Sequence, residues 1–151
     1  MGKIDLLQTP TLFGTSYPAP YNEPCLKRQR YRLGKAAGLT HFGVNRLVLA
    51  TGQWSSQRHW HHKEDEFIWV LQGEVVLVTD EGEQVLREGD CAGFKAGEPN
   101  GHHLQNRSSD DAIILEIGSD AADDVAEYPD IDMRSLPTGY VHKDATPYKN
   151  K

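Results

Sequence analysis

Three histidines and one glutamate have the residue types and spacing of a metal site. His59 and His61 are two residues apart, and Glu66 follows five residues after the second of them. Because a β-strand repeats every two residues, the two imidazoles would point to the same face. A turn after them would bring Glu66 back beside them, and His102 would complete the site from a distant strand. The sequence therefore predicts one metal site with these four ligands.

The ligand set narrows the choice of metal. Imidazole nitrogens with one carboxylate suit Fe, Mn, Ni, Co, Cu or Zn, whereas Ca and Mg prefer oxygen ligands. We therefore expect one divalent transition metal as the cofactor. Four protein ligands leave positions on an octahedral ion for water or substrate, so the site could support chemistry.

Other polar residues near the ligands are interpreted as bystanders. His62 and His103 each neighbour a predicted ligand, so a regular strand would point them to the opposite face. Glu64 and Asp65 are interpreted as solvated charges in the turn before Glu66. Asn106 has two readings, a turn residue or a support for the strand of His102, and we favour the turn residue.

The elements that would position these residues are short strands. Runs rich in Val, Ile and aromatic residues alternate with turn residues every 8 to 12 positions, which is typical of a sandwich or barrel. No amphipathic helix of three turns is visible among them. The expected strands are residues 41–50, 66–71, 74–79, 84–86, 91–94, 102–106 and 112–117. Trp60, Phe67 and Trp69 are out of phase with the ligands, and we expect them to pack in the barrel wall.

The sequence divides into three parts of one domain. Residues 1–40 contain four prolines and several aromatics, and we expect an extended N-terminal arm packed on the barrel. Residues 41–118 would form the barrel core. Residues 119–151 would form a C-terminal tail of the same domain, with a late edge strand within 139–148.

Two sets of residues resemble the conserved motifs of the cupin superfamily. The stretch from Gly52 to Gly73, with its HxH, four residues and glutamate, resembles the first motif, and the stretch from Gly89 to Asn106 resembles the second. The resemblance covers about residues 40–118 and is that of a small single-domain, type-2-like cupin. The sequence departs from the pattern in the length of two loops and in Lys95, where the second motif usually has proline.

The resemblance implies an all-β fold, the double-stranded β-helix or jelly roll. It also implies that His59, His61, Glu66 and His102 bind one divalent metal inside the barrel. Cupins of this size often pair through their outer sheets, so we expect a homodimer.

Two basic residues are weak candidates for binding a substrate. Arg46 lies among apolar residues of an expected strand, where an unpaired charge is costly, so it could hold an anion bidentately. An arginine that faces outward is an equally good reading. Lys95 would lie near the barrel mouth and could contact a phosphate or carboxylate, although such lysines are usually solvated. No catalytic residue is identified.

Three functions are consistent with this pattern. The first is a metal-dependent isomerase acting on a small polar or anionic molecule, such as a sugar phosphate. The second is an Fe(II)-dependent dioxygenase, which would need a pocket lined by apolar groups. The third is a non-catalytic module that binds a small molecule. The isomerase is preferred only slightly over the dioxygenase. The preference is small because a resemblance in fold does not decide between reactions.

Composition excludes some partners. The chain of 151 residues has a net charge of −6, which argues against non-specific binding of nucleic acid. Its one basic run, residues 27–30, is interpreted as a solvated turn or strand edge. No apolar stretch is long enough to span a bilayer, so no membrane partner is expected. Cys25 and Cys91 could form one disulfide, but nothing requires it, and we expect reduced thiols in a cytoplasmic protein.

Overall fold

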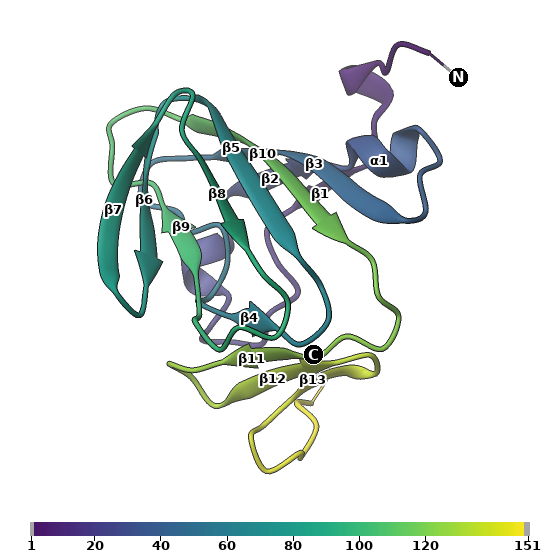
Figure 1. Cartoon of the computed structure of the whole chain (residues 1–151), viewed down its shortest axis with the longest axis vertical. Coiled ribbons are helices and arrows are strands. Elements are labelled where there is room, and N and C mark those ends of the chain that lie inside the picture. Colours follow the sequence, from purple (N-terminus) through teal and green to yellow (C-terminus); the bar gives the residue numbers. More distant parts are fainter. Residues whose placement is uncertain (1, 150–151) are drawn as a thin grey trace.

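The structure, a computed structural model, describes residues 2–149 and is built almost entirely of β-strands (Figure 1). Its largest sheet has six strands, and both the N-terminal arm and the barrel core contribute to it. The strand order is β1 (Thr11–Phe13), β2 (Arg28–Tyr31), β3 (Phe42–Leu49), β10 (Ala112–Ser119), β5 (Glu66–Gln72) and β8 (Cys91–Phe94). All neighbouring strands in this sheet are antiparallel.

A three-stranded sheet faces the large sheet and closes the apolar core. Its order is β7 (Gly82–Arg87), β6 (Glu74–Thr79) and β9 (His103–Gln105). Leu47 and Ile114 of the large sheet pack in one buried cluster with Val75, Leu77 and Leu104 of the small sheet. The β-branched and leucine side chains that alternate along these strands supply this cluster, because only one face of each strand points inward.

A third sheet, made mostly by the C-terminal tail, covers one end of the molecule (Figure 1). Its order is β13 (Gly139–Val141), β12 (Met133–Leu136), β11 (Ala126–Tyr128) and β4 (Trp60–His61). A second buried cluster lies here, formed by Tyr17, Cys25, Ala126, Tyr128 and Met133. The tail is therefore paired through β11 with the strand that carries His61.

Helices are few and short in the described residues. Helix α1 (Leu33–Ala36) packs on β3, and 3-10 turns occupy Leu6–Gln8 and Glu23–Cys25. No helix within residues 2–149 is both long enough and apolar enough to cross a bilayer. Cys25 is buried and Cys91 is exposed, and neither forms a disulfide.

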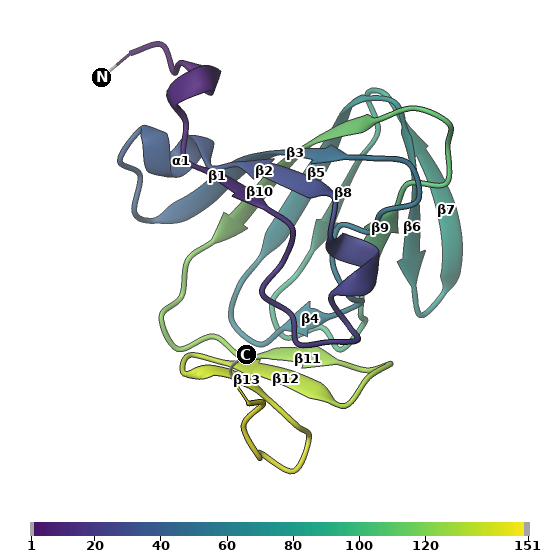
Figure 2. The same cartoon turned by 180° about the vertical axis from the view of Figure 1, so that it is seen from behind.

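The jelly-roll fold class predicted from the sequence is confirmed. All seven strands expected between residues 41 and 117 are present, with shifts of a few residues at their ends. The three sheets do not close into one continuous barrel. The arm does more than pack on the barrel, because β1 and β2 extend the large sheet beyond β3 (Figure 2). The tail likewise forms three strands where one was expected.

Two expectations about the exposure of side chains are wrong. The basic run at residues 27–30 is not a solvated turn or strand edge, because all but the exposed Lys27 lie in β2, between β1 and β3, where Arg28 is only 8% exposed. Phe67 and Trp69 do lie on the opposite face of β5 from Glu66, but they are 37% and 47% exposed and do not pack into a core. With Leu71 they form an apolar row on the outer face of the large sheet.

This exposed row supports the expected homodimer, which stays a prediction. Three large apolar side chains on one strand are costly to leave in water, and burying them against a second copy would gain about 25 cal/mol per Å². We expect sedimentation equilibrium to give twice the mass of one chain, and Trp69→Lys to give the mass of a single chain. Val85→Lys, at an exposed site on β7, should leave the dimer intact. A single-chain mass for the wild-type protein would contradict the prediction.

Candidate metal centre

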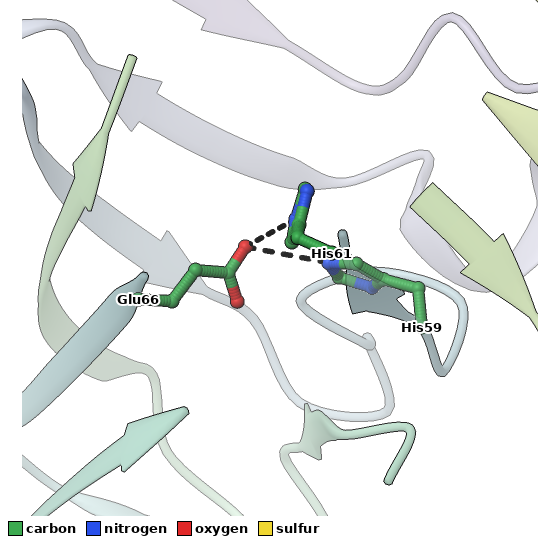
Figure 3. A group of neighbouring side chains, drawn as sticks. All are labelled: His59, His61 and Glu66. Atoms are coloured by element: carbon green, nitrogen blue, oxygen red, sulfur yellow. Dashed lines mark ion pairs between the residues drawn. The ribbon is translucent and has the colours of Figure 1, made fainter. Parts of the chain in front are cut away.

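Local pairing brings the predicted ligands together. His59 and His102 form an antiparallel bridge, in which the His102 amide donates to the His59 carbonyl at 2.9 Å and the His59 amide donates back at 3.2 Å. His61 lies two residues on, in β4, and Glu66 is the first residue of β5 after a short turn. Figure 3 shows the imidazoles of His59 and His61 directed toward the Glu66 carboxylate.

The Nε2 atoms of the three imidazoles converge on the Glu66 carboxylate. His61 Nε2 lies 2.6 Å and His59 Nε2 lies 3.5 Å from Glu66 Oε1, while His102 Nε2 contacts the other oxygen, Oε2. One ligand atom from each of His59, His61 and Glu66 lies within 4.8 Å of the others. Three nitrogens and one carboxylate that converge in this way match the donors of a transition-metal site.

Hydrogen bonds at the far side of two rings direct Nε2 toward the centre. His59 Nδ1 donates to the Gln57 carbonyl at 2.8 Å, and His61 Nδ1 donates to Asp124 Oδ2 at 2.6 Å. A proton on Nδ1 leaves the Nε2 lone pair free for a metal. His102 is held differently: its Nδ1 is buried without a partner among the described residues, and the Phe94 ring stacks on it at 3.6 Å.

The charges in this cluster are strongly coupled. Burial raises the pKa of the Glu66 carboxyl, but hydrogen bonds to three imidazoles outweigh burial and hold this pKa well below its usual value. Burial lowers the pKa of His61, yet contacts with the Glu66 and Asp124 carboxylates raise it to about 9. The cluster thus holds a carboxylate anion that is matched by positive charge, and a bound cation would replace the proton on His61.

The two histidines interpreted as bystanders face away from the centre. The His62 ring stacks on Trp60, and its Nε2 lies 3.0 Å from Glu127 Oε1. Both nitrogens of His103 are occupied, because Nδ1 donates to the Ser56 carbonyl at 2.8 Å and Nε2 lies 3.0 Å from the Gln105 amide nitrogen. Strand parity therefore separates the four converging side chains from their neighbours in sequence.

The two weak substrate candidates lie in different places. Arg46 is on the opposite face of β3 from the buried Leu47, and its guanidinium lies over the Tyr31 ring at 5.4 Å, away from the centre. Lys95 is exposed and lines a cavity of about 370 Å³ that also reaches His61 and His102. The structure thus places Lys95 beside the centre and leaves Arg46 on the outer face.

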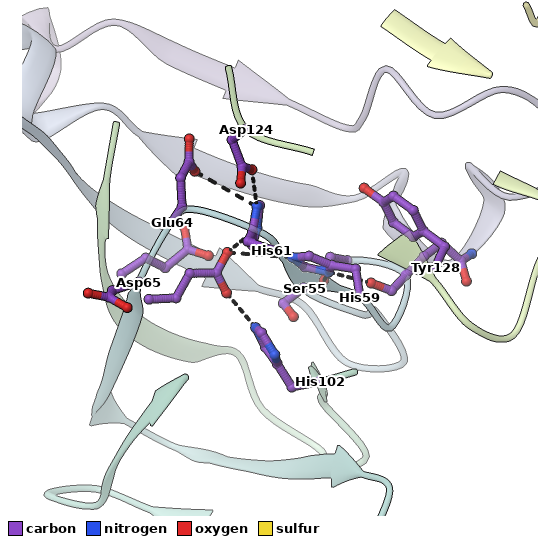
Figure 4. A network of polar contacts seen from close by, with 12 residues as sticks. Ser55, His59, His61, Glu64, Asp65, His102, Asp124 and Tyr128 are labelled. Atoms are coloured by element: carbon purple, nitrogen blue, oxygen red, sulfur yellow. Dashed lines mark hydrogen bonds and ion pairs between the residues drawn. The ribbon is translucent and has the colours of Figure 1, made fainter. Parts of the chain in front are cut away.

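Two carboxylates behind His61 were missed or misinterpreted. Glu64 is half-buried, not solvated as expected, and its Oε2 lies 3.9 Å from His61 Nδ1 (Figure 4). Burial is the main cause that raises the pKa of Glu64. Asp124 comes from the tail, where nothing in the sequence links it to the ligands. With His61 these two carboxylates form a second group whose ligand atoms lie within 4.8 Å of one another.

Arginines of the N-terminal arm line a cavity that the centre also borders, which the sequence reading did not anticipate. A larger cavity of about 820 Å³ is lined by Arg28 and Arg30 together with His59, Glu66 and His102. The signal was present as the alternation of arginines at positions 28, 30 and 32, which places them on one face of a strand.

Asp124 is expected to set the metal affinity through His61. Its Oδ2 accepts the His61 Nδ1 proton while its Oδ1 accepts the Lys63 amide proton at 2.8 Å, so it fixes both the ring and the turn. Asp124→Asn should weaken metal binding by roughly 10–100-fold in a competition assay with a coloured chelator. Asp123→Asn, at an exposed neighbour that pairs with Lys63, should leave the affinity unchanged. Equal affinities for the two variants would contradict this role.

The fold and the centre together define the class of this protein, a jelly roll in which three imidazoles and a carboxylate converge. Comparison with known proteins agrees with this class. The family model for the cupin domain matches residues 45–118. No curated protein sequence matches the chain.

Solved structures give longer matches. A sugar phosphate isomerase from a cupin superfamily, from Silicibacter pomeroyi DSS-3, is 40% identical with a TM-score of 0.91, and the match covers 98% of this chain and 97% of that one. A candidate sugar phosphate isomerase from Acidithiobacillus ferrooxidans is 26% identical with a TM-score of 0.73, covering 83% and 82%. The polyketide cyclase RemF from Streptomyces resistomycificus is 16% identical with a TM-score of 0.62, covering 79% of each chain, and shares the fold. The chain belongs to the cupin superfamily.

Proposed function

We propose that this protein is a metal-dependent isomerase of a phosphorylated sugar or a similar hydroxy-carbonyl compound. The observation that carries the proposal is the likeness, at 40% identity over nearly the whole chain, to a cupin described as a sugar phosphate isomerase. The converging centre supports it, because it opens into a cavity of about 820 Å³, large enough for a small sugar derivative.

The residues present fit a divalent transition metal as the cofactor. His59, His61, Glu66 and His102 would hold it, and when bound it would polarise the adjacent oxygens of a hydroxy-carbonyl substrate. The chain's own part is to hold the imidazoles in one tautomer through Gln57 and Asp124. The cavity walls would orient the rest of the substrate.

The cavity lining favours an isomerase over the dioxygenase alternative. A dioxygenase of the expected kind needs apolar walls, whereas the walls of this cavity are mixed, with Arg28, Arg30 and Glu116 beside apolar residues such as Ile68 and Phe94. The charged part of these walls suits a substrate rich in hydroxyl and charged groups. The non-catalytic alternative has no particular observation in its favour.

The reaction can be tested by following proton exchange. The protein, loaded in turn with Mn, Fe, Co, Ni or Zn, would be incubated in D₂O with a panel of aldose and ketose phosphates. We expect interconversion of at least one pair, with deuterium appearing in the NMR spectrum on the carbon next to the carbonyl. The unphosphorylated sugars serve as the control. Absence of exchange with every metal, or oxygen uptake by the iron form, would contradict the proposal.

A further inference from the structure

The arm strand β2 directs a row of arginines into the molecule. Arg28 and Arg30 pair in register with Leu49 and Leu47 of β3, both of which are fully buried. Side chains at paired positions of neighbouring strands lie on the same face, so these two arginines face the interior. Arg32 continues the alternation just past the end of the strand.

This row shares the large cavity with the metal centre. Arg28, Arg30, Arg32 and Lys35 of α1 all line the cavity of about 820 Å³ that is also lined by the ligands His59, Glu66 and His102. The cationic row and the centre therefore border the same cavity.

Arg28 carries a buried charge without an acidic partner. It is only 8% exposed, and its Nε donates to the Gly14 carbonyl at 2.8 Å while its Nη1 donates to the Ser55 carbonyl. Its guanidinium lies over the Tyr17 ring at 5.7 Å. Among residues 2–149 no carboxylate lies within 4 Å of it. The two carbonyls and the Tyr17 ring replace water around the guanidinium, but its positive charge stays unmatched and would attract an anion in the cavity.

The other members of the row differ in their pairing. Arg30 is held by Glu116 in a two-point contact, with Nε 2.6 Å from Oε1 and Nη2 3.1 Å from Oε2. Its charge is already matched, so it forms part of the wall. Arg32 and Lys35 have no carboxylate within 4 Å in the described part of the chain, and they are free to meet a ligand.

We propose that Arg32 and Lys35 form the subsite for the phosphate group of the substrate, and that the unmatched charge of Arg28 adds to the positive potential of the same cavity. The inference rests on the proposed function and adds the place where the phosphate binds. Guanidinium groups match a phosphate in both charge and geometry, and lysine adds a point charge. With the phosphate held by the arm, the hydroxy-carbonyl end of the substrate extends toward the centre.

The smaller cavity is a poorer place for a phosphate. Lys95 lines it, but so do the carboxylates of Glu64, Glu81 and Glu98. Like charges disfavour a phosphate dianion there. The large cavity is also lined by carboxylates, those of Glu64, Glu66, Glu116 and Asp120, but there four arginine and lysine side chains accompany them, whereas Lys95 is the one lysine or arginine among the described residues that line the smaller cavity.

Binding of a simple phosphate ester tests the subsite without requiring turnover. Isothermal titration of the protein as purified would compare glycerol 3-phosphate with glycerol. We expect Arg32→Gln to weaken binding of glycerol 3-phosphate by roughly tenfold or more, because a hydrogen bond to a charged group contributes that much. Lys35→Gln should weaken it less, because a lysine contributes a single point charge.

Two matched variants control for loss of positive charge alone. Arg46→Gln removes an arginine from the outer face of β3, and Lys95→Gln removes a lysine from the smaller cavity. Both should bind glycerol 3-phosphate like the wild-type protein. Binding that survives Arg32→Gln and Lys35→Gln, or that is lost in Lys95→Gln, overturns the subsite, because the phosphate would then bind the metal or the other cavity.

The same variants separate this inference from the proposed function. Loss of phosphate binding in Arg32→Gln, in a protein that isomerises no sugar phosphate, would uphold the subsite and reject the isomerase. Isomerisation with an unchanged KM in Arg32→Gln would uphold the isomerase and reject the subsite. If the proposed isomerase activity and the proposed subsite are both correct, Arg32→Gln raises the KM for the phosphorylated substrate more than it lowers kcat.

Discussion

Replacing His61 with alanine is expected to remove most of the bound metal from the protein. The His61 Nε2 atom lies 2.6 Å from Glu66 Oε1, at the point where the other imidazoles converge. Without this ring one nitrogen ligand is lost, and the carboxylates of Glu66 and Asp124 face each other without the imidazole between them. Loss of a supporting residue alone costs roughly 10–100-fold in metal affinity, so loss of a ligand should exceed that.

Elemental analysis of protein purified without a metal-binding tag measures this directly. We expect close to one equivalent of metal per wild-type chain and little in His61→Ala. His62→Ala is the matched control, because His62 is adjacent in sequence but stacks on Trp60 and pairs with Glu127. Equal metal content in wild type and His61→Ala would show that the centre is assigned wrongly. A predominance of iron in the wild type would favour the dioxygenase alternative.

The convergence of these four side chains could be predicted because it depends on local geometry. His59 and His61 share a face through the two-residue period of an extended chain, and a turn of four residues returns Glu66 to them. His102 was placed by its resemblance to a second motif, and the backbone bridge between His59 and His102 explains why that motif lies opposite the first. These features depend on the two-residue period of a strand, on the length of the turn and on the pairing of two motifs, all of which can be recognised in a sequence.

The residues that surround the ligands could not be predicted in the same way. Asp124 reaches His61 because the tail folds back and β11 pairs with β4, a long-range pairing with no local signal. Glu64 was judged from its place in a turn, but the tail also covers that turn, and the Ala121 amide donates to its Oε1 at 3.2 Å. Both contacts arise from tertiary packing.

The arm arginines were misjudged for a different reason. Their alternation was visible, but a charged run is usually solvated, since burying a charge costs free energy. Arg28 is an exception because two backbone carbonyls and the Tyr17 ring replace its water. A costly arrangement of this kind is most often found where a protein binds a ligand.

Substitution of Asn106 is expected to have the second large effect, a loss of folding stability. Its side chain is 1% exposed and satisfies four groups: its Nδ2 donates to the Leu49 and Asp110 carbonyls, and its Oδ1 accepts from the amide and hydroxyl of Ser108. The reading as a turn residue fits these contacts, and the bond to Leu49 also fastens the turn to the end of β3. Asn106 is therefore part of the framework and is not a ligand.

Asn106→Ala should lower the free energy of unfolding by about 3 kcal/mol, because buried donors and acceptors lose their partners. For a chain of this size that corresponds to a fall in Tm of roughly 10 °C, measurable by thermal unfolding followed by circular dichroism. Asn106→Asp should be at least as damaging, since a carboxylate cannot donate to the Leu49 and Asp110 carbonyls.

Asn100→Ala provides the comparison for this prediction. Asn100 also bridges a turn, accepting from the Asp80 amide at 2.8 Å and donating to Glu81 at 2.6 Å, but both of these partners are exposed to water. Water can replace these bonds, so the loss should be within about 1 kcal/mol. If Asn106→Ala proved no more destabilising than Asn100→Ala, the buried network around Asn106 would not stabilise the fold in the way described.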